Sequence, residues 1–180
     1  MTRFVALLRG VNVGGNKGVP MSALKALAER LSLGSPTTLL QSGNLVFSSE
    51  GKSAGALEPL LERAIKDDMG VETKVCVRTA ALWTALVQAN PFHAEAEADP
   101  GHLVLVAFKD APKASGPEAI AKAYAGPERI ELVSDHAFIV YPDGIGRSKL
   151  TPALLARHLG EGTARNWNTV LKIQAALKAD

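Results

Sequence analysis

Residues 37–47, TTLLQSGNLVF, contain two short apolar runs separated by a tight polar turn. The runs at 37–40 and 45–47 predict two strands, because the turn between them contains glycine and asparagine, which tolerate the positive φ angles of hairpin turns. Helical patterns lie on both sides of this hairpin. A hairpin placed between two helices is typical of a split βαβ arrangement, so these residues indicate the fold class.

The segments around the hairpin complete one domain. Residues 4–8 form an apolar run that predicts a strand, and apolar residues recur at helical spacing over 21–31 and again over 57–69. Residues 73–77 predict a further strand, and residues 80–89 an additional helix. The order strand, helix, strand, strand, helix, strand predicts an α+β, ferredoxin-like unit with a mainly antiparallel sheet.

The second half of the chain repeats this order. A segment rich in alanine and glutamate, expected to be a linker, precedes it, and the final element is a helix where a fourth strand is expected. We therefore predict two tandem ferredoxin-like (split βαβ) units. Their expected limits are 1–91 for the first unit with its extra helix, 92–101 for the linker, and 102–180 for a second unit of order βαββα with a C-terminal helix. The elements expected in it are strands at 103–108, 129–133 and 137–141, and helices at 117–124, 152–159 and from Trp167 onward.

Composition excludes several classes of protein. The chain has 180 residues, and 20 basic against 18 acidic residues give a net charge of +2, so any affinity for nucleic acid must come from a local patch. A single cysteine, Cys76 in an apolar run, excludes an internal disulfide and is expected in the core. The four histidines are far apart, and no metal site is expected. No apolar stretch is long enough to span a bilayer, so we expect a cytoplasmic protein without a membrane partner.

The first motif is LRGVNVGGNKG at residues 8–18. Glycine lacks the Cβ that would block an anion from approaching the backbone N–H groups, so the loop is a candidate ligand-binding site. It lacks the spacing of a dinucleotide fingerprint and of a Walker loop. The alternative is a structural glycine loop in which asparagine side chains bond the local backbone. The candidate residues are Arg9, Asn12, Gly14, Gly15 and Asn16.

The second motif is the turn QSGN at residues 41–44. A hairpin turn explains Gly43 and Asn44 without any ligand. Gln41 and Ser42 interrupt an otherwise apolar strand, which a turn explains less well. Gln41, Ser42 and Asn44 are therefore candidates for ligand binding.

The third motif, YPDGIGRSK at residues 141–149, precedes the helix that Thr151 and Pro152 are expected to open. A helix N-terminus with nearby cations is a seat for phosphate or carboxylate. The alternative is a turn with solvated charges. The candidate residues are Arg147, Ser148 and Lys149.

The fourth motif is TARNWNT at residues 163–169. Arginine and asparagine beside a tryptophan resemble a surface that stacks on a base and bonds it. The alternative is that Asn166 or Thr163 caps the last helix and that Trp167 belongs to the core. The candidate residues are Arg165, Asn166, Trp167 and Asn168.

The four motifs together resemble domain-of-unknown-function family 1697, a bacterial family of uncharacterised proteins. The resemblance extends from about residue 4 to about residue 177. The chain departs from the family pattern at Thr163 and Ala164, where the family more often has two threonines. The resemblance implies a tandem of two small α+β domains, and it implies no particular activity, substrate or cofactor.

Three functions remain open from the sequence. The first is binding of a phosphate-bearing ligand, a nucleotide or a nucleic acid, through the Gly/Asn/Arg loops. The second is an enzyme that acts on a small anionic substrate. The shortage of candidate general bases argues against it, because no motif contains a histidine and Asp143 is the one acid within a motif. The third is a structural or interaction protein in which the polar loops satisfy buried backbone groups.

Overall fold

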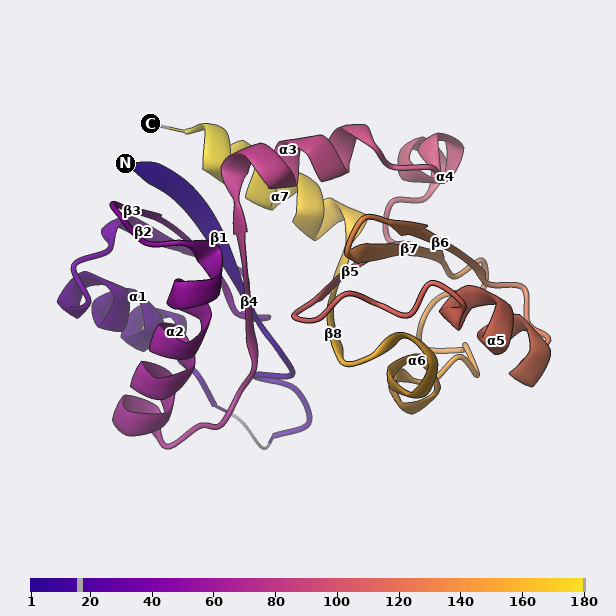
Figure 1. Ribbon diagram of the computed structural model, residues 1–180, viewed down its shortest axis with the longest axis horizontal. Helices are drawn as coiled ribbons and strands as arrows, with labels where there is room; N and C mark the ends of the chain where they lie inside the picture. Colours follow the sequence, from indigo (N-terminus) through magenta and orange to yellow (C-terminus); the bar gives the residue numbers. More distant parts are fainter. Residues whose placement is uncertain (16–17, 180) are drawn as a thin grey trace. The chain divides into compact units, whose positions relative to one another are not determined.

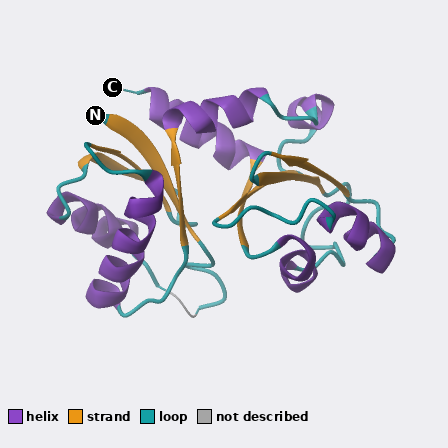
Figure 2. Ribbon diagram, viewed as in Figure 1, coloured by secondary structure: helices purple, strands orange, loops and turns teal. Residues whose placement is uncertain are grey.

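The computed structural model describes residues 1–15 and 18–179, which divide into two compact units. Unit 1 comprises Met1–Ala85 and the C-terminal segment from Lys172, and unit 2 comprises Leu86–Leu171. Each unit has its own four-stranded antiparallel sheet with helices (Figures 1 and 2). The expected α+β class with two tandem units is therefore confirmed. Among the described residues, no helix is both long and apolar enough to cross a membrane.

Unit 1 has the strand order β2-β3-β1-β4, with every neighbouring pair antiparallel. Figure 1 shows α1 and α2 against one face of this sheet. The strands β2 and β3 are the hairpin expected from residues 37–47. The bounds are β1 Thr2–Leu8, α1 Met21–Arg30, β2 Gly34–Leu39, β3 Asn44–Ser49, α2 Ala54–Met69 and β4 Val75–Thr79.

Side chains alternate between the two faces of the sheet along β1, and one set of them forms part of the core of unit 1. Phe4, Ala6 and Leu8 point to the helical face and are buried against the apolar stripes of α1 and α2. Phe4 stacks on Phe47 of β3 with ring centroids 5.7 Å apart. Ser53 caps α2 by accepting the N–H of Ala56 at 3.2 Å.

Unit 2 repeats this topology with the strand order β6-β7-β5-β8, again antiparallel throughout. The helices α5 and α6 lie together on one face of its sheet (Figure 1). Two further helices, α3 Ala80–Gln88 and α7 Trp167–Lys178, each begin in one unit and end in the other. The bounds are β5 Leu103–Phe108, α5 Gly116–Ala123, β6 Arg129–Val133, β7 His136–Val140, α6 Pro152–Leu159 and β8 Gly162–Asn166.

The strand β8 corrects the expectation that the second unit ends in a helix without a fourth strand. Thr163 and Arg165 of this strand are buried, and Ala164 and Asn166 are exposed. A strand whose buried side chains are polar lacks the apolar alternation by which strands are recognised. The sequence pattern therefore indicated a capping segment where the structure has an edge strand that pairs with β5.

The segment expected as a linker, 92–101, also contains regular structure. It includes the short helix α4 His93–Ala98. Glu95 of this helix forms an ion pair with Arg129 of β6, and the Arg129 guanidinium lies over the Phe92 ring at 5.0 Å. These contacts attach α4 to the sheet of unit 2, which a run of alanine and glutamate does not indicate.

The junctions β4–α3 and β8–α7 share a local design. Arg78 is buried on β4 and donates to the carbonyl of Val77 at 2.9 Å, and Arg165 is buried on β8 and donates to that of Ala164 at 2.8 Å. The residue after each arginine caps the next helix: Thr79 accepts the N–H of Leu82, and Asn166 that of Thr169. The two units are thus alike in detail as well as in element order.

Candidate functional site

The first two motifs meet at one end of the sheet of unit 1. Because β1 and β3 are antiparallel, the end of β1 and the start of β3 lie at the same edge. The N–H of Leu8 donates to the carbonyl of Gly43 at 2.9 Å. We call this region, made of residues 9–15, 41–44 and 73–74, the glycine-loop end.

Asn12 joins the two motifs. Its side-chain amide donates to the carbonyl of Gln41 at 2.7 Å and to the carbonyl of Val19 at 2.9 Å. Its side-chain oxygen accepts the N–H of Val19 at 2.8 Å. The backbone of Asn12 has φ +57°, a conformation that asparagine tolerates better than most residues. The local bonding considered for Asn12 is present, and it extends to the second motif.

The glycines beyond Asn12 leave the backbone of the loop open. Gly10, Gly14 and Gly15 have φ angles of +61°, +62° and +77°, and a Cβ at any of them would meet no atom within 4 Å. The chain then enters α1 at Pro20, which provides no side-chain cap, and no acidic residue occupies the first turn. Open glycine backbone before an uncapped helix favours an anion. The candidate Asn16 lies outside the described residues.

Two cationic residues flank this loop. The N–H of Arg9 donates to the carbonyl of Lys74 at 2.9 Å, which continues the β1–β4 pairing by one residue. Residues directly opposite in an antiparallel pair have side chains on the same face. The hydroxyl of Thr73 donates to the carbonyl of Arg9 at 2.9 Å and holds this corner. At the glycine-loop end, Arg9 and Lys74 therefore lie on the same face of the sheet.

The polar side chains of the second motif serve the turn itself. Asn44 is completely buried, and its amide donates to the carbonyl of Leu39 at 2.7 Å and to the hydroxyl of Ser42 at 3.0 Å. Gln41 is exposed and contributes its carbonyl to Asn12. In this motif the side chain of Gln41 is thus the one best placed to reach a ligand.

The third motif belongs to unit 2. Arg147 and Lys149 are exposed, and so is Asp143. Ser148 has partners within the chain, because its hydroxyl donates to Glu128 and accepts the N–H of Leu150 at 3.0 Å. Thr151 caps α6, because its hydroxyl oxygen accepts the N–H of Leu154 at 3.2 Å. A side chain of the protein itself therefore satisfies one of the free N–H groups at the N-terminus of this helix.

The fourth motif is built into the sheet and core of unit 2. Arg165 is only 8% exposed, and Trp167 is 4% exposed with its ring 6.1 Å from that of Phe138. Asn166 accepts both the N–H and the hydroxyl of Thr169, at 3.0 and 3.1 Å. Asn168 is exposed. Asn166 thus caps the last helix, and Trp167 is buried in the core, as the alternative interpretation of this motif expects.

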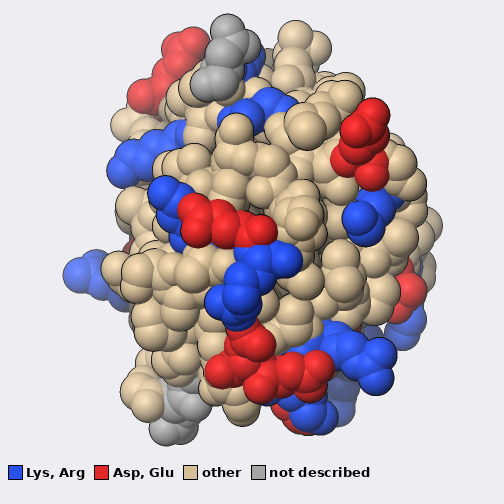
Figure 3. All heavy atoms as spheres, turned by 90° about the vertical axis from the view of Figure 1, so that its left-hand side faces the viewer, with Lys and Arg blue, Asp and Glu red and all other residues tan. Residues whose placement is uncertain are grey.

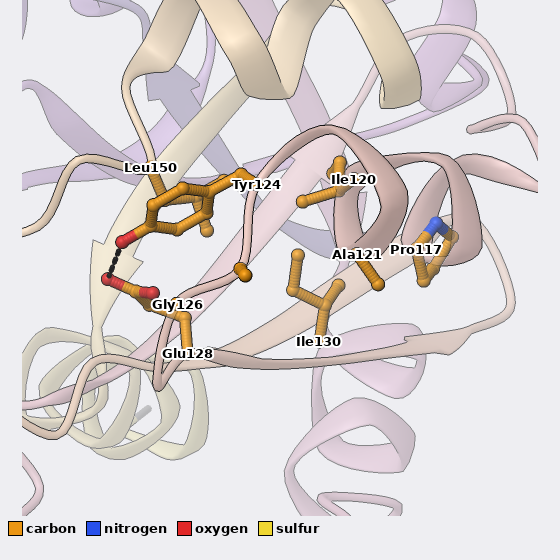
Figure 4. A pocket seen from close by; sticks show the side chains of 9 residues that line it. Pro117, Ile120, Ala121, Tyr124, Gly126, Glu128, Ile130 and Leu150 are labelled. Carbon is orange, nitrogen blue, oxygen red and sulfur yellow. Dashed lines mark hydrogen bonds between the residues drawn. The ribbon is translucent and has the colours of Figure 1, made fainter.

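No sequence pattern singled out a cluster of polar side chains in unit 2, which consists of the Glu128 carboxylate and two hydroxyl groups. Glu128 accepts hydrogen bonds from Ser148 and, at 3.3 Å, from the hydroxyl of Tyr124 (Figure 4). It borders a cavity beside α5. Tyr124 and Glu128 lie in a segment without a recognisable motif. Ser148 is 20 residues away from Glu128, so no local pattern connects the two. The one feature of the sequence that could have indicated this cluster was Glu128 itself, an acidic residue between Pro127 and a predicted strand.

Burial, together with Glu128, raises the pKa of both tyrosines of the chain. Burial and the charge of Glu128 raise the pKa of Tyr141 to about 12. Desolvation and the hydrogen bond to Glu128 also raise the pKa of Tyr124. Because a neutral phenol is favoured in the folded state, its stabilisation is complete below the unfolded pKa of about 10 and is lost as the pH rises toward 12.

We therefore expect less tyrosinate absorbance at pH 10 in the folded protein than in the unfolded chain, where each phenol is about half ionised. A spectrophotometric titration checks this, since the chain has 2 tyrosines. Tyr141→Phe removes the later ionisation and serves as the control. Half-ionisation of both phenols near pH 10, in protein that remains folded, would contradict this description of the cluster.

The comparisons with known proteins are consistent with the fold described above. The family model described as "Protein of unknown function (DUF1697)" matches residues 1–138. Among solved structures, the conserved bacterial protein SP0830 from Streptococcus pneumoniae is similar, with a TM-score of 0.73 and 21% sequence identity over 98% of this chain and 99% of that one. At this identity the likeness shows the fold alone. A search of curated proteins finds no match.

Proposed function

This chain belongs to the DUF1697 family of proteins of unknown function, and we propose that it binds a phosphate-bearing ligand, a nucleotide or nucleic acid, at the glycine-loop end of unit 1. The observation that carries the proposal is the position of Asn12. Its amide ties an open run of glycine backbone both to the approach to α1 and to the second motif. A loop held in this way presents N–H groups without further ordering on binding.

The local charge supports the same ligand class. Arg9 and Lys74 flank the loop, while the first turn of the uncapped helix α1 has no acid to compete with an anion. On the face shown in Figure 3, basic and acidic side chains are interspersed. Lys66 in the last turn of α2, for example, pairs with Glu72, which follows the helix, at 2.5 Å. Attraction of an anion therefore depends on the local arrangement of cations and not on the net charge of +2.

The exposed lysine of the site provides the test. We expect Lys74→Gln to weaken binding of ADP about tenfold, because it removes one charge-assisted contact worth about 1.5 kcal/mol. Isothermal titration calorimetry at low and moderate salt measures this, and the wild-type affinity should fall as salt rises.

Lys52→Gln is the matched control, since Lys52 is also exposed and follows β3 at the opposite end of the sheet. Equal affinities of the Lys74 and Lys52 variants for ADP would place any bound phosphate elsewhere. Absence of binding to ADP, to inorganic phosphate and to short RNA in the wild-type protein would refute the proposal.

We further propose that each unit is a ferredoxin-like (split βαβ) domain. The support is the element order together with the strand orders β2-β3-β1-β4 and β6-β7-β5-β8, which are the same when the two units are compared strand by strand. Many RNA-binding domains have this order of elements, and that analogy is compatible with the proposed ligand class.

The fourth motif supports a second role, in folding. Arg165 and Trp167 are buried, and Asn166 fixes the first turn of α7. We propose that these three residues determine the β8–α7 junction and do not bind a ligand. The candidate sites in unit 2 then reduce to the exposed Arg147, Lys149 and Asn168.

A further inference from the structure

Two exposed apolar residues lie at the glycine-loop end, beside the proposed phosphate site. Val13 is 61% exposed, and Leu40 is 46% exposed. Val13 comes directly before Gly14, whose backbone is open. Apolar surface that stays in water contributes nothing to folding, because its removal from water is what stabilises the folded state. A ligand site, in contrast, usually combines apolar side chains with a few polar groups.

The packing of the glycine loop on the hairpin turn places these two residues next to each other. A Cβ on Gly43 would lie 2.6 Å from Cγ2 of Val11, so the loop and the turn are in contact at this point. The next contact outward joins the side-chain amide of Asn12 to the carbonyl of Gln41 at 2.7 Å. The two segments therefore run past each other in opposite directions, and the two exposed apolar residues are the next pair in this series.

The backbone of Leu40 points to a role beyond the turn. Its φ angle is +57°, in the left-handed region, which costs free energy for a residue with a bulky side chain. Within the described residues, the other non-glycine positions with positive φ hold asparagine or serine. The turn alone would favour such a small polar residue at position 40. A strained leucine that is also exposed is better explained by a contact with a ligand.

We propose that Val13 and Leu40 form the seat for the base of a mononucleotide whose phosphates bind at the glycine loop. This inference rests on the proposed phosphate site and adds the class of ligand to it. A base has a flat, largely apolar face, and covering aliphatic side chains with this face removes both surfaces from water. Gln41 follows Leu40, and its exposed side-chain amide is able to donate to the edge of the base and to accept from it.

The extent of this surface fits one nucleotide better than a strand of nucleic acid. Within residues 9–15, 41–44 and 73–74, the cations are Arg9 and Lys74. A protein that holds a strand follows the successive phosphates with a row of cations and offers stacking side chains to successive bases. The seat at Val13 and Leu40 has room for a single base. The ligand is therefore assigned as a free nucleotide.

ADP and inorganic pyrophosphate provide the test, because they share a diphosphate and only ADP carries a base. In isothermal titration calorimetry, we expect ADP to bind the wild-type protein at least tenfold more tightly than pyrophosphate. In methyl-detected NMR spectra of protein labelled at leucine and valine, ADP should shift the methyl resonances of Val13 and Leu40 upfield, because an aromatic ring covers them. Pyrophosphate should leave these methyl resonances in place.

Leu40→Asn removes the proposed contact from a backbone that asparagine tolerates better than leucine, so the fold should persist. Its affinity for ADP should fall about tenfold, while its affinity for pyrophosphate stays at the wild-type value. Leu82→Asn is the matched control. Leu82 is also an exposed leucine, and it follows β4 at the opposite end of the sheet. This variant should retain the preference for ADP.

The outcomes separate this inference from the phosphate proposal. If the wild-type protein binds ADP and pyrophosphate equally, the seat for the base is overturned and the phosphate site stands. If it binds neither, both proposals are refuted. An ADP affinity that Leu40→Asn leaves unchanged, or that Leu82→Asn lowers equally, also overturns the seat. A short oligoadenylate that binds more than tenfold tighter than ADP would assign the surface to RNA and overturn the choice of a free nucleotide.

Discussion

Gly43→Ala is expected to lower the free energy of unfolding by about 2–5 kcal/mol, one of the largest effects of any single methyl group in the chain. Gly43 has φ +79°, and its added Cβ would lie 2.6 Å from Cγ2 of Val11 and 2.9 Å from Cβ of Leu8. Both neighbours are buried, so neither has space to move aside. The substitution therefore combines backbone strain with a collision between the turn and the glycine loop.

Gly51→Ala separates these two causes. Gly51 has φ +68°, but a Cβ there would meet no atom within 4 Å. We expect it to cost only about 1 kcal/mol, which is the backbone strain alone. Urea denaturation of both variants measures the difference. Equal losses would mean that the turn and the loop are not packed together as the structure shows.

Asn12→Ala has the second large expected effect, about 2 kcal/mol of stability together with most of the affinity for ADP. The substitution removes three hydrogen bonds and leaves the N–H of buried Val19 without its acceptor. It also places alanine at φ +57°. The loop would then have to be ordered at the moment of binding, which weakens the affinity.

Asn12→Gly is the informative companion to this variant. Glycine adopts the same φ without strain but makes none of the side-chain bonds. Stability and ADP affinity should therefore stay low in Asn12→Gly, with only a partial recovery of stability relative to Asn12→Ala. Thermal unfolding and calorimetry check the two quantities separately. Wild-type affinity in Asn12→Gly would show that the side chain does not organise the site.

Local patterns were sufficient to predict most of the fold. The hairpin at 37–47 and the amphipathic helices around it have periodicities that depend on nearby residues alone. The strand β8 was not predicted, because Thr163 and Arg165 are buried polar residues on a strand that is stabilised by its neighbour β5. The helix α4 was missed for a related reason, since it is attached through Arg129, which lies 34 residues from Glu95.

The candidate site was predictable in composition but not in its contacts. Glycine and asparagine content identified the loop, and local bonding by Asn12 was foreseen as an alternative to ligand binding. Its contact with Gln41 spans 29 residues and depends on how β1 and β3 pair, which no local pattern encodes. The same holds for Ser148, whose partner Glu128 comes from a different loop. Contacts of this kind depend on tertiary structure.

The most direct test of the phosphate proposal is a ¹H–¹⁵N correlation spectrum of the wild-type protein titrated with ADP. We expect saturable shifts of the amide resonances of Gly10, Gly14 and Gly15, with smaller changes at Gln41 and Lys74. Inorganic phosphate should shift the same glycines more weakly. Saturable shifts confined to Arg147 and Lys149, or a spectrum that ADP leaves unchanged, would contradict the assignment of the glycine-loop end as the phosphate-binding site.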